Sequence, residues 1–139
     1  MPAKIEIGPI VKVVKSDEEW KKQLAQLAYQ VLRHEETERA FTNPLHENHA
    51  SGIYYCAGCE LPLFSSEHKF DSGTGWPSFW QPLDPKVIET RTDTKFFMTR
   101  VEVHCARCGG HQGHVFNDGP KPTGLRYCIN GVALKFIPA

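Results

Sequence analysis

The sequence lacks an excess of charge of either sign, because 16 lysines and arginines balance 16 aspartates and glutamates among its 139 residues. Nucleic-acid-binding proteins usually carry a basic excess that meets the phosphates, so the balance argues against that partner. It also lacks any apolar run near the roughly 20 residues that a membrane-spanning helix needs. The opening stretch, MPAKIEIGPIVKVVK, scatters lysines among its apolar residues and has no continuous signal-peptide core. We therefore expect a cytoplasmic protein without a membrane or nucleic-acid partner.

The cysteine pattern does not suit a secreted disulfide framework, because the five cysteines are an odd number. Four of them form two C-x-x-C pairs, Cys56 with Cys59 and Cys105 with Cys108. Each such turn brings two thiolates to one ion, and two turns complete a tetrahedral shell of four sulfurs. Four thiolates favour zinc, with iron as the alternative. Because no position is left open for water, we expect one structural zinc ion.

Two other interpretations of these cysteines fit the sequence less well. Buried or redox-active cysteines are one, but a redox C-x-x-C normally occurs once, without a matching pair. A catalytic zinc centre of the deaminase type is the other, but the H-x-E motif of that class is absent. The metal-binding interpretation therefore leaves one free thiol, Cys128, outside the site.

The apolar pattern predicts a mainly β fold in a single domain, residues 1–139, with its zinc-bound β core at 53–139. Glycine and proline are plentiful and apolar residues come in short runs, which favours strands and turns over a helical bundle. From Phe97 to His104, apolar and polar residues alternate with the period of a half-buried strand. Val132, Leu134 and Phe136 alternate in the same way. We expect antiparallel sheets.

Residues 16–52 are expected to form a helical extension and a connecting segment. Ser16 and Glu19 predict a capping box that opens a single helix, which continues to about Glu36. Apolar residues then recur at helical spacing: Trp20, Leu24, Leu27 and Val31. The charged stretch that follows reads as a surface connection with three solvated histidines, His34, His46 and His49. We expect residues 1–15 to be mobile.

Cys128 lies in a segment rich in strand formers, GLRYCIN, from Gly124 to Asn130. If that segment is extended, Arg126, Cys128 and Asn130 point to one face and the apolar residues between them to the other. A nearby arginine favours the thiolate, which predicts a lowered pKa for the Cys128 thiol. The pattern is typical of a reactive thiol on a rigid element.

Two further segments carry residues that suit chemistry. His111 and His114 are separated by two residues in a glycine-rich stretch that leads to Asp118. The segment GTGWPS places Trp76 in a tight turn. Taken singly, each has a common structural explanation, since a paired histidine can be a hydrogen-bonded corner and a turn tryptophan a plug.

Taken together, these motifs carry a resemblance to a known family. GWPSF at 75–79, the histidine segment ending in Asp118, and RYCIN at 126–130 occur in that order together with both C-x-x-C pairs. In this combination they closely resemble the type B methionine sulfoxide reductases, which act on the R epimer at sulfur. The resemblance extends from about Ser16 to Phe136 and includes TERAFT at 37–42. It implies two antiparallel sheets in a β-tent, with a zinc ion that ties two loops together away from the active site.

The same resemblance implies a peptide-methionine (R)-S-oxide reductase in which Cys128 is the nucleophile. Trp76, with Phe79, would bind the methyl group of the substrate. Three residues would line the pocket around the sulfoxide oxygen: His111, His114 and Asn130. Asp118 and Arg126 would support them.

The chemistry requires help at the sulfoxide oxygen, because the sulfur is a poor electrophile until that oxygen is protonated. A histidine can donate a proton near neutral pH, which is typically worth ~10²–10⁴-fold in rate. The Cys128 thiolate attacks sulfur, methionine leaves, and a sulfenic acid remains. We favour His114 as the donor because Asp118 is placed to orient it.

One departure from the family concerns recycling of the enzyme. Many members place a second cysteine where this sequence has Thr74. Here an external thiol from thioredoxin, glutaredoxin or glutathione is expected to reduce Cys128. The expected substrate is methionine sulfoxide, in oxidised proteins or as the free amino acid. The alternative is a non-catalytic zinc-bound β module that binds a protein or small ligand, since fold does not fix function. A zinc-ribbon nucleic-acid binder would need a basic face that the neutral charge does not promise.

Overall fold

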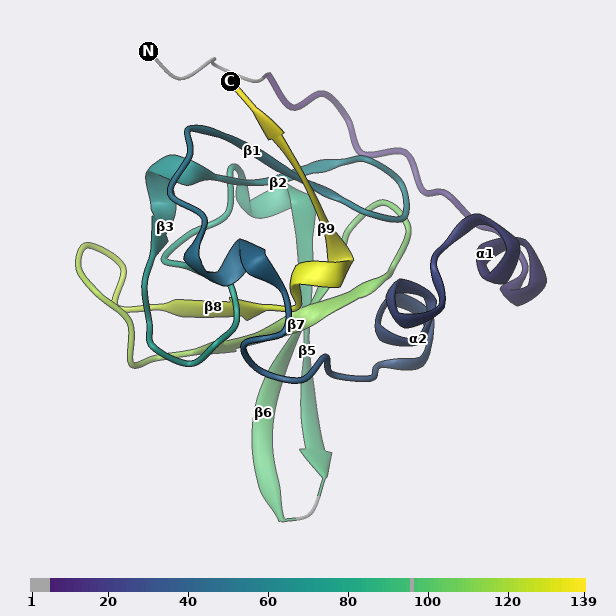
Figure 1. Cartoon of the computed structure of the whole chain (residues 1–139). Helices are drawn as coiled ribbons and strands as arrows, with labels where there is room; N and C mark the ends of the chain where they lie inside the picture. The colour runs from purple at the N-terminus through teal and green to yellow at the C-terminus, as the bar shows by residue number, and fades with distance from the viewer. Residues whose placement is uncertain (1–5, 96) are drawn as a thin grey trace.

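The computed structural model describes residues 6–95 and 97–139, which form two antiparallel sheets with two short helices beside them (Figure 1). The smaller sheet has the order β2 (Pro62–Ser65), β1 (Gly52–Cys56), β9 (Leu134–Pro138). The larger has the order β3 (Lys69–Phe70), β4 (Ser78–Phe79), β8 (Arg126–Ile129), β7 (His111–Phe116), β6 (Met98–Cys105), β5 (Ile88–Lys95). The predicted mainly β fold of antiparallel sheets is confirmed.

Single 3-10 turns lie in the connections between the helices and strands. They are η1 (Pro44–Glu47), η2 (Ser66–His68), η3 (Pro85–Val87) and η4 (Gly131–Ala133). Val132, predicted to belong to a strand with Leu134 and Phe136, lies in η4 instead, and β9 begins at Leu134.

Aromatic side chains join the two sheets in the core. Phe64 of the smaller sheet stacks on Phe79 of the larger, with ring centroids 4.4 Å apart and planes 17° from parallel. Tyr54 meets Phe79 edge to face at 5.0 Å. All three side chains are fully buried. Aromatic pairs of this kind contribute about 0.5–1.5 kcal/mol beyond the burial of their area, so they fix how one sheet lies on the other.

The predicted single helix is wrong, because two helices are present: α1 (Asp17–Gln23) and α2 (Gln26–His34). The capping box of Ser16 and Glu19 is confirmed. The backbone turns extended at Leu24, so that Trp20 and Val31 are both buried while Leu27 stays exposed. Burial against the β domain outweighs helical propensity, which is only a weak preference.

The helices are attached to the loops that carry the C-x-x-C pairs. In α1, Gln23 Nε2 donates to the backbone oxygen of Gly58 at 2.7 Å. In α2, Arg33 donates to the backbone oxygen of Cys108 at 2.8 Å. Among the described residues, no helix has the length and apolar character that crossing a membrane requires.

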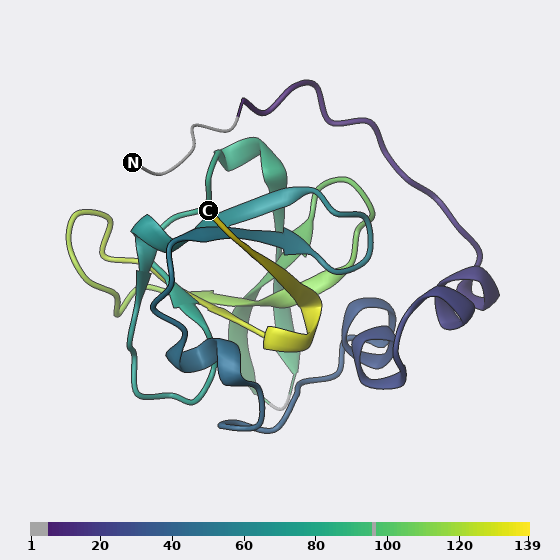
Figure 2. The same ribbon diagram turned by 45° about the horizontal axis from the view of Figure 1, so that its top comes forward.

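Residues 6–16, before α1, run in extended form along the outside of the β domain (Figure 2). Val13 N donates to Arg107 O at 2.8 Å, and Lys12 pairs with Glu89. The predicted mobility of residues 1–15 stays a prediction, and residues 1–5 lie outside the described part of the chain. The single-domain boundaries likewise remain a prediction.

The connecting segment after α2 is only partly the surface connection that the sequence predicts. His34 and His49 are exposed and His46 is half-buried. Glu38, in contrast, is only 1% exposed. A carboxylate is rarely buried without bonds that compensate it, so Glu38 needs hydrogen-bond donors inside the protein.

The β5–β6 hairpin extends beyond the body of the molecule (Figure 1). Phe97 lies in its turn with a positive φ of 61° and is fully exposed, so the strand predicted from Phe97 begins at Met98. The prediction of a half-buried strand fails toward the Cys105 end of β6, because the polar residues Glu102 and His104 are buried there as well, each only 4% exposed. Their polar side chains therefore need partners inside the protein.

We expect Phe79→Ala to lower the free energy of unfolding by about 3–5 kcal/mol, because it empties a core site between the sheets. Phe97→Ala is the matched control and should change stability by less than about 0.5 kcal/mol, since that ring is exposed. Urea titrations monitored by fluorescence measure both variants. A Phe79→Ala protein of wild-type stability would contradict the assignment of Phe79 to the core.

Candidate active site

The four cysteines of the two C-x-x-C pairs meet in one cluster between the loops that follow β1 and β6. Their sulfur atoms all lie within 4.8 Å of one another. Cys56 and Cys108 are 3.7 Å apart at sulfur, and Cys59 and Cys105 are 3.4 Å apart. Sulfurs at a tetrahedral zinc, each about 2.3 Å from the metal, stand about 3.8 Å from one another. The cluster can therefore hold a metal ion of that size.

Donors around the cluster suit sulfurs that carry negative charge. Gly110 N donates to the sulfur of Cys108, and Gln112 Nε2 donates to that of Cys56, each at 3.4 Å. Gln112 is fully buried. Such outer contacts orient metal-ligating groups and are typical of built metal sites.

A separate pocket of about 240 Å³ opens on the face of the larger sheet. Its size suits one side chain, since drug-sized ligands occupy roughly 300–1,000 Å³. Five of the residues that the sequence predicts for the site line this pocket: Trp76, His114, Arg126, Cys128 and Asn130. Its other lining residues are Thr37, Thr74, Arg100, Gly113, Phe116 and Ile129. Among these described residues there is no cysteine of the metal cluster.

Cys128 reaches the pocket because of the alternation of β8. Arg126 and Cys128 are half-buried, while Tyr127 and Ile129 are buried on the other face, as the sequence predicts. Burial raises the pKa of the Cys128 thiol, although the Thr74 hydroxyl and the Arg126 guanidinium act in the opposite direction. The predicted lowering of this pKa is therefore wrong, because loss of hydration outweighs the arginine.

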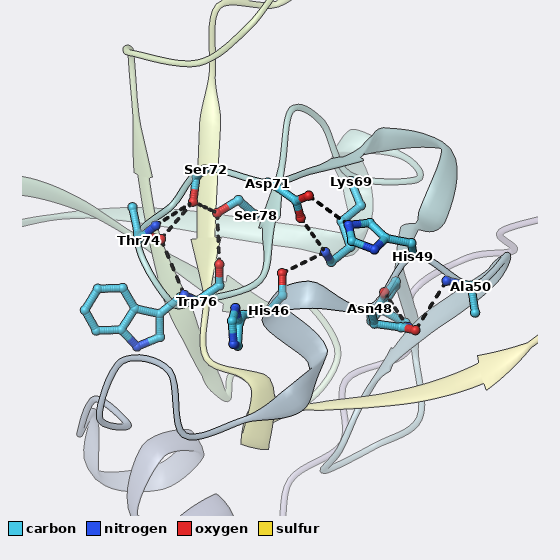
Figure 3. Close-up of polar contacts among 11 residues, drawn as sticks. His46, Asn48, His49, Ala50, Lys69, Asp71, Ser72, Thr74, Trp76 and Ser78 are labelled. Atoms are coloured by element: carbon cyan, nitrogen blue, oxygen red, sulfur yellow. Dashed lines mark hydrogen bonds and ion pairs between the residues drawn. The ribbon is translucent and has the colours of Figure 1, made fainter.

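A chain of hydroxyl groups shapes the turn that carries Trp76 (Figure 3). Ser72 Oγ lies 2.8 Å from Thr74 Oγ1 and 2.7 Å from Ser78 Oγ. Trp76 N donates to Thr74 Oγ1 at 3.4 Å, and Ser78 Oγ donates to Trp76 O at 3.1 Å. Thr74 Oγ1 also lies 4.0 Å from the sulfur of Cys128. Hydrogen bonds from residues before and after Trp76 thus fix the turn next to the Cys128 thiol.

Glu38 connects two pocket residues and was missed by the sequence analysis as a site residue. Its backbone oxygen accepts from Trp76 Nε1 at 3.0 Å, and its backbone N donates to Asn130 Oδ1 at 2.9 Å. Its carboxylate accepts from Val132 N at 2.9 Å. Burial raises the pKa of the Glu38 carboxyl. The only signal in the sequence was its place in the TERAFT segment.

Asn130 is held at both ends of its amide. Besides the bond from Glu38, its Nδ2 donates to Gln112 O at 3.1 Å, and the residue is 3% exposed. Because an amide nitrogen carries two hydrogens, one remains for a ligand in the pocket.

Arg126 is fixed by Asp118 in a two-point contact. Its Nε and one terminal nitrogen donate to the two carboxylate oxygens at 2.9 and 3.1 Å. The guanidinium also lies over the Phe116 ring, 4.4 Å from the centroid. The hydrogen bond from Arg126 lowers the pKa of Asp118. The expectation that Asp118 orients His114 is therefore wrong, since both oxygens face Arg126.

The two histidines lie on one face of the sheet because of a bulge. The β6–β7 register shifts so that Val103 pairs with Gly113 and His104 pairs with His111. Without the shift, residues three apart would point to opposite faces. The His111 and His114 rings are 5.4 Å apart at their centroids. Burial, followed by the charge of Arg100, lowers the pKa of His114.

Comparison with known proteins shows the family. A model of the SelR domain matches residues 24–138. The chain is 54% identical over 125 residues to the peptide methionine sulfoxide reductase MsrB of Leptospira interrogans, covering 90% of this chain and 95% of that one. It is 54% identical over 124 residues to MsrB of Thiobacillus denitrificans, covering 89% and 94%. For MsrB of Methanosarcina barkeri the identity is 55% over 124 residues, covering 89% and 87%.

The chain belongs to the type B methionine sulfoxide reductase family.

Within this reductase fold, two residues do not lie where the family resemblance led us to expect them. Phe79 does not line the pocket, because it is fully buried between the sheets. His111 is 1% exposed and is absent from the pocket lining. Of the two imidazoles, that of His114 lines the pocket, and the centroid of the His111 ring lies 5.4 Å from that of His114. The other expected pocket residues, Trp76 and Asn130 among them, are brought together.

We expect alkylation of Cys128 by iodoacetamide to have its pH midpoint above that of free cysteine in the same buffer, because burial disfavours the thiolate. Mass spectrometry of the Cys128 peptide measures the rate separately from the cluster cysteines. Arg126→Gln should move the midpoint higher still, since it removes a cation that favours the thiolate. A midpoint below that of free cysteine would contradict the account of this thiol.

Proposed function

We propose that this protein reduces the R epimer of methionine sulfoxide, in oxidised proteins and as the free amino acid, to methionine, with Cys128 as the nucleophile. The supporting observation is a thiol outside the metal cluster that lines a pocket with His114 and Trp76. The similarity to reductases named for this substrate supports the same reaction.

In the proposed reaction the sulfur of Cys128 attacks the sulfoxide sulfur. The substrate S–O bond breaks, oxygen passes to Cys128, and its sulfur is oxidised to a sulfenic acid while the substrate is reduced to a thioether. The proton count closes, because the thiol proton becomes the proton of the sulfenic acid. His114, whose pKa is lowered, is neutral near pH 7 and can take that proton and deliver it to the oxygen.

Stereospecificity follows because the pocket fixes three positions around the substrate sulfur: the attacking thiol, the oxygen and the methyl group. Cys128 defines the side of attack, His114 and the free Asn130 hydrogen define the position of oxygen, and the Trp76 indole receives the methyl group. An aromatic ring suits a methyl group on oxidised sulfur as it suits thioethers. The R epimer is the one on which the family acts, and the fourth position is left for the peptide.

Regeneration requires an external thiol. Among the described pocket residues, Thr74 is the hydroxyl nearest to Cys128, and a hydroxyl cannot form a disulfide. A thiol from thioredoxin, glutaredoxin or glutathione attacks the sulfenic acid, water leaves, and a mixed disulfide forms. A second thiol then releases Cys128 and leaves the reductant as a disulfide.

The metal of the cysteine cluster is proposed to be zinc, held by Cys56, Cys59, Cys105 and Cys108. Zinc would neutralise the buried thiolates and tie the loops after β1 and β6 together. With four sulfur ligands it would have no position for water and would take no part in the redox step.

The test of the reaction is turnover of racemic methionine sulfoxide with dithiothreitol. Wild-type protein should consume the R epimer and leave the S epimer, and Cys128→Ser should lose all measurable turnover while remaining folded. Chiral chromatography measures both epimers. Activity in Cys128→Ser would overturn the role of the thiol, and consumption of the S epimer would overturn the assigned stereochemistry.

The same reaction without reductant should leave one added oxygen on Cys128, trapped by dimedone and located by mass spectrometry. Added glutathione should convert it to a mixed disulfide. A disulfide between Cys128 and a cluster cysteine would instead contradict regeneration by an external thiol.

We expect one zinc ion per chain, measured by atomic emission spectrometry. Cys56→Ser should lose the metal and lower the melting temperature, because metal binding contributes to folding free energy. Cys128→Ser is the matched control and should keep both. Equal metal content in the two variants would contradict the four-cysteine site.

A further inference from the structure

A carboxylate, an imidazole and a thiol lie in register across three neighbouring strands. Glu102 of β6 is directly opposite His114 of β7, and His114 is directly opposite Cys128 of β8. Residues paired in this way share a face of the sheet, with Cβ atoms about 4.5–5.5 Å apart. The sheet therefore builds a row of acid, imidazole and thiol that ends in the pocket.

Glu102 is a costly residue in this place. It is 4% exposed, and an unpaired buried carboxylate is strongly unfavourable. One of its oxygens accepts from His104 Nε2 at 3.2 Å. The hydrogen bond to His104 is among the contacts that keep the pKa of the Glu102 carboxyl below its usual range although burial acts in the opposite direction. A buried carboxylate kept ionised suits a neighbour that becomes positive.

His114 is the neighbour that can become positive. One ring nitrogen lies within 4.8 Å of a carboxylate oxygen of Glu102 and of one of Asp93. Its Nε2 is buried and makes no hydrogen bond to any residue of the described chain. Catalytic hydrogen bonds are often long before substrate binds and shorten in the complex. The imidazole is thus close to an acid that can orient it.

We propose that Glu102 is a positioning residue, which orients His114 and compensates its positive charge while it carries the proton from Cys128 to the sulfoxide oxygen. This inference rests on the proposed function. It follows the general arrangement in which a nucleophile is served by a base that a third group orients. No atom is gained or lost, because His114 accepts the thiol proton and donates the same proton to oxygen.

The charges around His114 single out Glu102 for this role. Arg100 disfavours the imidazolium, but its guanidinium is 3.8 Å from Asp93, which offsets it. The titratable groups facing His114 come from four strands: Asp93 of β5, Arg100, Glu102 and His104 of β6, His111 of β7, and Arg126 and Cys128 of β8. Because Asp93 lies by Arg100 and Asp118 pairs with Arg126, Glu102 is the carboxylate that faces the imidazolium from the directly opposite position.

The test is Glu102→Gln, which keeps the size of the side chain and a polar contact for His104. We expect kcat to fall about 10–100-fold, less than the loss of a whole general acid, and KM to change little. The acid limb of the kcat/KM profile should move to lower pH, because removing a negative charge makes His114 harder to protonate. A purely structural effect would leave that limb in place.

Glu89→Gln is the matched control. Glu89 lies on the same face of the same hairpin, opposite His104, but its side chain is 56% exposed and pairs with Lys12. We expect wild-type kcat and an unshifted profile. A Glu102→Gln enzyme that matches Glu89→Gln in both readouts would overturn the positioning role.

Failure of the inference is separable from failure of the proposed function. If Cys128→Ser keeps activity, the reaction itself is wrong. If Cys128 is required but Glu102→Gln is fully active, only the inference fails. If Glu102→Gln does not fold, carbon-13 spectra of wild-type protein labelled at glutamate provide the test. The chemical shift of the Glu102 carboxyl carbon must change at the pH where His114 titrates. A chemical shift that stays constant through that titration would overturn the proposal.

Discussion

The pairing of β7 with β8 is the constraint on which the site depends. It sets His114 directly opposite Cys128, and the pairing of β6 with β7 extends the row to Glu102. A slip of one residue in either pair would turn every side chain of a strand to the other face, and the thiol would be lost to the core. Aromatic packing of Phe64 on Phe79 holds the larger sheet in place from behind. The same strands therefore carry core side chains on one face and the residues of the site on the other.

The five cysteines lie in two separate places in the structure. Four lie in one cluster whose sulfur spacing suits a tetrahedral ion and whose loops also anchor both helices. The fifth, Cys128, lies in a pocket whose described lining contains none of the others. In the proposed function, this separation keeps the nucleophilic sulfur from ligating the metal, and the cluster serves to stabilise the fold.

Short-range patterns allowed much of this to be predicted from the sequence. The alternation around Cys128 and the spacing of the cysteine pairs depend on neighbours only a few residues apart. What failed depends on distant parts of the chain. The bulge that brings His111 and His114 to one face, the helix break at Leu24, and the burial of Glu38 all arise from packing between segments far apart in sequence. Likewise, the pKa of Cys128 follows from how deeply the fold buries it.

The most direct test of this account is a crystal structure of the Cys128→Ser protein with a peptide containing (R)-methionine sulfoxide. The account requires the substrate sulfur to face residue 128, the methyl group to lie on the Trp76 indole, and the sulfoxide oxygen to accept a hydrogen bond from the His114 ring. A peptide bound outside this pocket, or a sulfoxide oxygen directed away from His114, would contradict it.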